Sequence, residues 1–315
     1  DHQMTVNEKP RRSTEHFRID KANHNNLKNL SVDIPKNALV SVCGVSGSGK
    51  SSLMLEAFTE KYPESIVMGQ GSIGISSRST LATYMGIMDE IRSIFAKATG
   101  QPAGLFSFNS LGACPICKGK GVLQPDVAFA DPVTVVCEAC DGTRYSEEAL
   151  SYRFQNKNIV DILGLTIDEV ADYFESQKIL NRVNTLKEVG LGYLTLGQTT
   201  SSLSGGEVQR LKLASHLKKA GQIYVLDEPS SGLHAKDNTK LLDVFRNLVE
   251  KGNSVIIIEH NLDFIAASDW VVELGPRGGK AGGEIVFEGT PGEMLYAEAP
   301  TAKWLKAGVT AFPSK

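Results

Sequence analysis

A glycine-rich loop set between an apolar strand and a helix constrains this sequence more than any other feature. Residues 44–51 read Gly-Val-Ser-Gly-Ser-Gly-Lys-Ser, which has the spacing G-x-x-x-x-G-K-[ST]. The apolar run 38–43 predicts a buried strand before the loop, and a helix is expected to begin near Lys50. Backbone N–H groups and a helix N-terminus would then converge on a bound phosphate. The sequence therefore predicts a nucleotide-binding α/β domain.

The residues of this loop are expected to bind ATP together with Mg²⁺. Lys50 is expected to reach the β and γ phosphates, and the hydroxyl of Ser51 to ligate Mg²⁺. Cys43, directly before the loop, is expected to be a small core residue of the strand. The predicted nucleotide contacts of the loop are Gly44, Val45, Ser46, Gly47, Ser48, Gly49, Lys50, Ser51 and Ser52.

A second apolar strand, 223–227, ends in two carboxylates. Asp227 is expected to bind Mg²⁺, and Glu228 to contact the water that attacks the γ-phosphate. The alternative interpretation of an acidic pair at a strand end is an ordinary solvent-exposed turn. Beside the phosphate loop we favour the catalytic interpretation.

Other segments complete an α/β pattern. A β-branched run at 255–259 predicts a central parallel strand beside 223–227, with their crossover helix passing through 241–249. Further strands are expected at 30–34, 270–274 and 284–288, and an amphipathic helix over 84–98.

The peptide that begins at Leu203 precedes an amphipathic helix. Ser204 can cap that helix, and the N–H groups of the following glycines offer a second anion site; a simple helix cap is the alternative. The chain order decides between them, because phosphate loop, this peptide, Asp-Glu and then His260 is the order of ATP-binding cassettes. The nucleotide contacts predicted here are Ser204, Gly205, Gly206 and Glu207.

Four of the five cysteines form two Cys-x-x-Cys pairs. Nineteen residues separate the pairs Cys114/Cys117 and Cys137/Cys140, which is a spacing typical of structural zinc sites. Periodicity fades from about 100 to 160, so this segment is expected to be organised around something other than a hydrophobic core. The sequence predicts one Zn²⁺ held by four thiolates, without catalytic duty.

Longer motifs resemble the UvrA family, the A subunit of the excinuclease, and in particular its second nucleotide-binding half. The resemblance covers about residues 18–295. The matching peptides are His-Asn-Asn-Leu-Lys (24–28), the phosphate loop (44–52), Leu-Ser-Gly-Gly-Glu-Val-Gln-Arg (203–210), Leu-Asp-Glu-Pro-Ser-Ser-Gly-Leu-His (226–234), Glu-His-Asn-Leu-Asp (259–263) and Leu-Gly-Pro-Arg-Gly-Gly (274–279).

This resemblance implies an α/β fold: an ABC-type P-loop ATPase cassette with an inserted zinc-binding signature domain. The cassette core is expected at 17–75 and 197–300, and the inserted domain at 76–196 with its zinc module at 110–145. A polar N-terminal tail is expected at 1–16 and a C-terminal tail at 301–315.

Further roles follow from the resemblance alone. Gln70 would contact Mg²⁺, Glu228 would be the catalytic base, His260 would sense the γ-phosphate, and 231–234 would meet the opposing cassette. The sequence departs from the family after Gln70, where 71–75 read Gly-Ser-Ile-Gly-Ile. No aromatic residue stands where transporter cassettes stack adenine; the local residues are His24 and Asn25, with Phe17 as a weak substitute.

The zinc module of the UvrA family is associated with DNA contact. A net charge of −3 gives no general attraction to polyanions, so duplex DNA would have to be held by a local patch. The candidates are Lys118, Lys120 and Arg144 in the module, with Arg153 beside it.

Three functions are consistent with these features. The leading one is a UvrA-like DNA-binding ATPase that couples cassette dimerisation to recognition of distorted duplex DNA, as in nucleotide excision repair. The alternatives are a UvrA-like paralog for drug or self-resistance and a transporter-type subunit. The expected partners are a second cassette, as a homodimer or a separate half, and a UvrB-like protein bound through a missing first half.

No membrane partner is expected. Neither a run of 18 apolar residues nor a signal peptide is visible, and the expected location is cytoplasmic.

Overall fold

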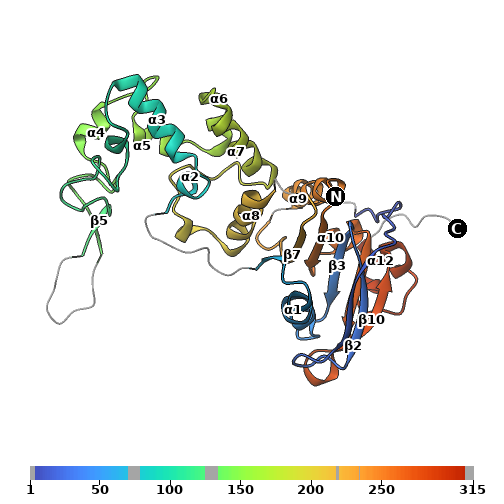
Figure 1. The fold of residues 1–315 in the computed structure, drawn as a ribbon. Coiled ribbons are helices and arrows are strands. Elements are labelled where there is room, and N and C mark those ends of the chain that lie inside the picture. Colours follow the sequence, from blue (N-terminus) through green and yellow to red (C-terminus); the bar gives the residue numbers. More distant parts are fainter. Residues whose placement is uncertain (1–3, 70–78, 125–133, 218–219, 234, 309–315) are drawn as a thin grey trace, which may run out of the picture. The chain divides into compact units, whose positions relative to one another are not determined.

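The computed structural model describes residues 4–69, 79–124, 134–217, 220–233 and 235–308 (Figure 1). The described residues divide into two compact units. Unit 1 draws on Asp1–Ser72, Glu188–Gly190 and Ser204–Lys315, and unit 2 on Ile73–Lys187 and Leu191–Leu203. Unit 2 is therefore inserted into the chain of unit 1.

A six-stranded sheet forms the centre of unit 1. Its order is β10-β9-β3-β8-β7-β4, and all neighbours are parallel except β10 with β9. The first of these strands, β3, is buried along its whole length, as its apolar sequence requires. The strands are β3 (Leu39–Gly44), β4 (Ile66–Met68), β7 (Ile223–Asp227), β8 (Ser254–Ile258), β9 (Trp270–Gly275) and β10 (Glu284–Gly289).

Two further layers cover this sheet. On one face, the antiparallel pair β1 (His16–Ala22) and β2 (Leu30–Pro35) joins η1 (Ser52–Phe58) in a continuous apolar cluster with β3, β8 and β9. On the other face lie helices of the C-terminal part of the chain. These are α9 (Ala235–Glu250), α10 (Leu262–Ala267), α11 (Pro291–Met294) and α12 (Ala302–Gly308).

The predicted strands of the central sheet are confirmed to within one residue at each end. Four described strands were not expected from the sequence: β1 and the three-residue β4 in unit 1, and two two-residue strands in unit 2. Within β1, Phe17 and Ile19 are buried between exposed neighbours, so an alternating pattern was present but short.

Phe17, named as a weak substitute for an adenine-stacking residue, is part of the core. It is 5% exposed and its ring packs edge-on against Phe58 and Tyr62, with centroids 5.5 Å and 5.0 Å away. Burial in this aromatic cluster makes Phe17 a core residue.

Unit 2 is mainly helical. The expected single helix over 84–98 is wrong in its first turn: α2 ends at Tyr84, Gly86 adopts φ 67°, and α3 begins at Met88. The helices are α2 (Leu81–Tyr84), α3 (Met88–Thr99), η2 (Ala103–Phe106), α4 (Glu147–Ser151), α5 (Ile159–Leu163), α6 (Ile167–Tyr173), α7 (Gln177–Glu188) and η3 (Thr200–Ser202), and the short strands β5 (Val122–Leu123) and β6 (Val135–Val136) form a hairpin pair.

An aromatic core also runs through unit 2. Phe95 and Phe106 are fully buried with centroids 5.0 Å apart, and Tyr145 is 1% exposed. The expectation that 100–160 lacks a hydrophobic core is therefore only partly right, because an aromatic cluster accompanies the cysteines.

The described parts of the segments expected to be tails, 4–16 and 301–308, take part in unit 1. Asn7 donates from Nδ2 to the carbonyl of Ser268 (3.1 Å), and α12 buries Ala302 and Leu305. In the described part of the chain, no helix combines the length and the apolar character needed to cross a membrane.

Candidate nucleotide and zinc sites

The phosphate loop leaves β3 at Gly44 and is held from outside by the glycine-rich loop after β9. The carbonyls of Gly47 and Ser48 accept hydrogen bonds from the N–H groups of Gly279 and Gly283, both at 2.9 Å. A Cβ on Gly44 would lie 2.0 Å from the carbonyl oxygen of Leu274, so only glycine fits there. With these carbonyls engaged outward, the loop can present N–H groups to an anion.

Lys50 lies buried inside this loop. Its Nζ donates to the carbonyls of Gly44 (2.9 Å) and Val45 (3.1 Å), and the residue is 6% exposed. Burial lowers the pKa of Lys50, while the nearby charges of Glu228 and Asp227 oppose that shift. The ammonium is thus fixed at the loop and offers a charge for phosphates.

The two carboxylates follow β7 at the same edge of the sheet. Glu228 adopts φ 50°, a left-handed conformation, and its N–H donates to the carbonyl of Ile258 (2.9 Å). Burial and the neighbouring Glu228 raise the pKa of Asp227, and Lys50 partly offsets this. A divalent cation would favour the ionised form of Asp227, and binding of Mg²⁺ by Asp227 and Ser51 stays a prediction.

His260 follows β8 and approaches Glu228, with 3.7 Å between Nε2 and Oε1. Burial and the charge of Lys50 lower the pKa of His260, although Glu228 opposes the shift. The imidazole is therefore neutral at pH 7 and can donate or accept at either nitrogen. The structure brings Lys50, Asp227, Glu228 and His260 to one edge of the sheet.

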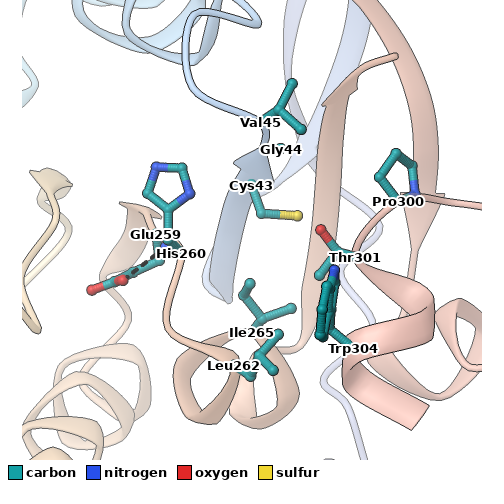
Figure 2. Close-up of a pocket in the computed structure, with 10 residues that line it drawn as sticks. All are labelled: Cys43, Gly44, Val45, Glu259, His260, Leu262, Ile265, Pro300, Thr301 and Trp304. Carbon is teal, nitrogen blue, oxygen red and sulfur yellow. Dashed lines mark hydrogen bonds between the residues drawn. The ribbon is translucent and has the colours of Figure 1, made fainter. Parts of the chain in front are cut away.

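A cavity of about 280 Å³ adjoins the start of the phosphate loop (Figure 2). The His260 ring and the Glu259 carboxylate point in different directions there, although the two residues are consecutive. The lining residues are Cys43, Gly44, Val45, Glu259, His260, Leu262, Ile265, Pro300, Thr301 and Trp304.

The peptide 203–210, the signature peptide, begins helix α8 (Gly205–His216) with a capping box. The Glu207 N–H donates to Ser204 Oγ (3.3 Å), and the Ser204 N–H donates to Glu207 Oε2 (2.6 Å). A Cβ on Gly206 would lie 2.1 Å from the carbonyl oxygen of Ser231, so the helix start abuts the loop after β7. Ser204 therefore does cap the helix, and whether it also binds nucleotide stays a prediction.

One residue that the sequence analysis did not single out supports the end of β7. Gln209 is 1% exposed, and its Nε2 donates to the carbonyls of Met68 (2.7 Å) and Asp227 (3.0 Å). It joins α8 to the ends of β4 and β7, next to the carboxylate pair.

Some predicted site residues lie outside the described residues. They are Gln70, the altered segment 71–75 and His234. The two residues nearest the predicted adenine position are engaged elsewhere: His24 Nε2 lies 3.0 Å from Glu60 Oε2, and Asn25 Nδ2 donates to Ser52 Oγ and Glu56.

The four cysteines Cys114, Cys117, Cys137 and Cys140 form one buried cluster in unit 2. Their sulfur atoms all lie within 4.8 Å of one another, at 4.0 Å for Cys114–Cys137 and 3.7 Å for Cys117–Cys140. Tetrahedral Zn²⁺ with Zn–S bonds of about 2.3 Å requires sulfurs about 3.8 Å apart. The four sulfurs are therefore close to the spacing of a zinc site, and the cluster could hold zinc.

A backbone hydrogen bond supports this donor set. The Gly121 N–H donates to Cys117 Sγ (3.2 Å). Burial opposes ionisation of Cys117, but this bond and the neighbouring thiols lower its pKa to about 7. Burial and the neighbouring thiols raise the pKa of Cys140 to about 12, so in this cluster the first thiolate forms at Cys117. A thiolate is the form that a metal binds.

The basic residues of the zinc module differ in their surroundings. Lys118 and Lys120 are exposed, whereas the Arg144 guanidinium lies 5.2 Å from the ring centroid of Phe108. Arg153 pairs with Asp161 at 3.5 Å. The two lysines are thus the more accessible candidates for phosphate contact.

Known proteins resemble this chain closely. The family described as ABC transporter matches residues 27–231. UvrABC system protein A from Aquifex aeolicus (strain VF5) is 43% identical over 333 residues, covering 95% of this chain and 36% of that protein. Its counterpart from Staphylococcus aureus (strain COL) is 44% identical over 319 residues, covering 90% and 34%.

A solved structure agrees with these relatives. The crystal structure of UvrA2 from Deinococcus radiodurans has a TM-score of 0.88 and 40% identity, covering 98% of this chain and 41% of that one. The chain spans about a third of the length of the curated relatives that it matches. The predicted cassette fold and the resemblance to UvrA are confirmed. The chain therefore belongs to the ATP-binding-cassette ATPases and is homologous to part of UvrABC system protein A.

Proposed function

We propose that this chain is an ATP-hydrolysing cassette of the UvrA type, which pairs with a second cassette and couples nucleotide turnover to recognition of distorted duplex DNA. The observation that carries the proposal is the convergence of Lys50, Asp227, Glu228 and His260 at one sheet edge. That combination supplies a phosphate-binding cation, a Mg²⁺ ligand and a base for water.

Each residue has a distinct task in this proposal. Lys50 binds the β and γ phosphates, since its ammonium already lies within the loop. Glu228 accepts a proton from the attacking water. His260, neutral at pH 7, donates a hydrogen bond to the γ-phosphate from one ring nitrogen and interacts with Glu228 through the other.

ATP is expected to drive a head-to-tail pairing of two chains. In cassettes of this motif order, the Ser204 peptide completes the nucleotide site of the opposing cassette, so two sites are shared. Light scattering at micromolar protein with saturating Mg-ATP should show dimer, and Glu228→Gln should accumulate it. Monomer in every nucleotide state would argue against self-pairing and would point to a separate half as the partner.

Duplex DNA binding is expected to be non-specific and sensitive to salt. Each phosphate contact contributes a slope of about −0.9 in log affinity against log salt. Replacing both Lys118 and Lys120 with alanine should reduce that slope by up to about two units for every duplex sequence, because phosphates carry no base identity. Fluorescence anisotropy at several salt concentrations measures this.

The charge-matched control removes Lys178 and Lys187, which also belong to unit 2. They pair with Glu90 at 3.4 Å and Asp168 at 3.2 Å, so this control should keep the parent slope. Absence of duplex binding at low salt in every nucleotide state would reject the DNA role and favour a resistance paralog with another ligand. Comparing damaged with intact duplex, with and without ATP, tests the recognition step.

A further inference from the structure

Glu259 is a buried acid at the nucleotide site that has no role in the proposed chemistry. It follows β8 directly and is 2% exposed. Its Oε1 accepts the N–H of Ser230 (2.8 Å), and its Oε2 accepts the N–H groups of His260 (3.0 Å) and Asn261 (3.1 Å). Figure 2 shows its carboxylate turned toward the backbone at His260.

These donors belong to two different loops. Ser230 lies in the turn after β7, directly before the segment 231–234 that is expected to meet the opposing cassette, whereas His260 and Asn261 begin the loop after β8. The loops start side by side because β7 and β8 are parallel neighbours, with Asp227 opposite Ile258. One carboxylate thus joins the two loops through three backbone hydrogen bonds.

The turn after β7 also contacts the start of helix α8. The carbonyl of Ser231 lies where a Cβ of Gly206 would be, so the turn and the start of α8 are in direct contact. A displacement of the turn therefore cannot leave the start of α8 unaffected.

We propose that Glu259 is a positioning residue that makes the His260 loop and the turn after β7 move as one unit. Through it, the position of His260 at the γ-phosphate and the surface offered to the opposing cassette are set together. This inference rests on the proposed function for its catalytic consequence, while the hydrogen-bond clamp itself can be tested without turnover.

Glutamine cannot replace this acid, although it has the same shape. All three partners are donors, and a glutamine brings one oxygen and one NH₂. Its NH₂ would face an N–H of one loop, and a buried polar pair would be left without acceptors. Aspartate is shorter, so it can keep the local bond to Asn261 but not reach Ser230.

The matched control is Asp269→Asn. Asp269 is also a buried acid, 7% exposed, that accepts backbone N–H groups from Leu39 (2.9 Å) and Arg11 (2.9 Å). It lies before β9, at the sheet edge where β3 begins, whereas the phosphate loop follows the end of β3. It repeats the chemistry of Glu259 away from the nucleotide site.

Hydrogen exchange by mass spectrometry, ATP affinity and turnover are measured on the wild type and the three variants. In Glu259→Gln, the amides of the loop that faces the NH₂ group, 230–233 or 260–263, should exchange about ten- to hundredfold faster, as loss of a hydrogen bond to a charged group predicts. Turnover should fall at least about tenfold, with ATP affinity within about threefold. Glu259→Asp should speed exchange in 230–233 alone, and Asp269→Asn should leave both loops and turnover unchanged.

Several results would overturn the inference. Unchanged exchange in both loops of Glu259→Gln, or faster exchange with turnover within about twofold of wild type, removes the positioning role. Equal losses in Asp269→Asn would show a general effect of losing a buried acid. If Glu259→Gln does not fold, the loop-selective result with Glu259→Asp decides. A wild type without ATP turnover rejects the proposed function, while the exchange measurements still test the clamp.

Discussion

Replacing Glu228 with glutamine is expected to slow ATP hydrolysis by about 10²–10⁴-fold while ATP binding persists. The amide keeps the shape of the side chain but cannot accept the proton of the attacking water. The substitution also removes the negative charge that lies 3.7 Å from Nε2 of His260. Steady-state phosphate release, together with titration of a fluorescent ATP analogue, measures the two effects separately.

Lys50→Ala is the companion variant, and it should lose binding itself. Its ammonium is the group held by the carbonyls of Gly44 and Val45. Without it those carbonyl dipoles would face the phosphates uncompensated. If Glu228→Gln turned over at a near-normal rate, Glu228 would have no part in the mechanism, whatever Lys50→Ala did.

Removing zinc is expected to have the second large effect, confined to unit 2. Structural zinc contributes about 10–16 kcal/mol of apparent binding free energy in small zinc-finger peptides, and this energy is available only to the folded site. We expect one Zn²⁺ per chain. Cys137→Ser should lose the metal and loosen the segment around the cysteines, while unit 1 continues to bind ATP. Elemental analysis and limited proteolysis measure the two outcomes.

Cys43→Ala provides the control for this experiment. Cys43 is a buried cysteine in β3 that is not part of the cluster, so its loss should leave the zinc content at one per chain. Wild-type protein purified without chelator that contains well under one zinc per chain would contradict the assignment. Chelation that unfolds unit 1 together with unit 2 would contradict the confinement of the effect.

The sequence predicted the central sheet well because each strand carries its own signal. The runs 223–227 and 270–274 are apolar and β-branched, and burial on both faces rewards that composition wherever the strand lies. The break between α2 and α3 was missed because Met85 and Met88 both suit a buried helical face, and both are indeed buried. The backbone turn at Gly86 left no mark on that pattern.

The candidate residues of the nucleotide site also carry local signals, and their roles stay predictions. Lys50 and Asp227 sit in short motifs whose spacing alone carries the chemistry. Glu259 and Gln209 have roles that arise from segments distant in sequence, since Glu259 accepts from Ser230 and Gln209 donates to Met68. The sequence offered one signal for Glu259, a polar residue directly after an apolar strand. Its role could not be predicted from that signal, because its partner Ser230 follows the neighbouring strand β7.

The strand order also dictates when the nucleotide site can form during synthesis. Strand β3, which leads into the phosphate loop, has β8 and β9 as its two neighbours, and Leu39 pairs with Val255 more than 200 positions later. A ribosome releases the N-terminal part first, at roughly 5–20 residues per second. At these rates, β3 and the phosphate loop are synthesised roughly ten seconds or more before the strands that flank β3 in the sheet. Unit 2 emerges in that interval, so chaperones would meet a β3 that still lacks both of its neighbouring strands.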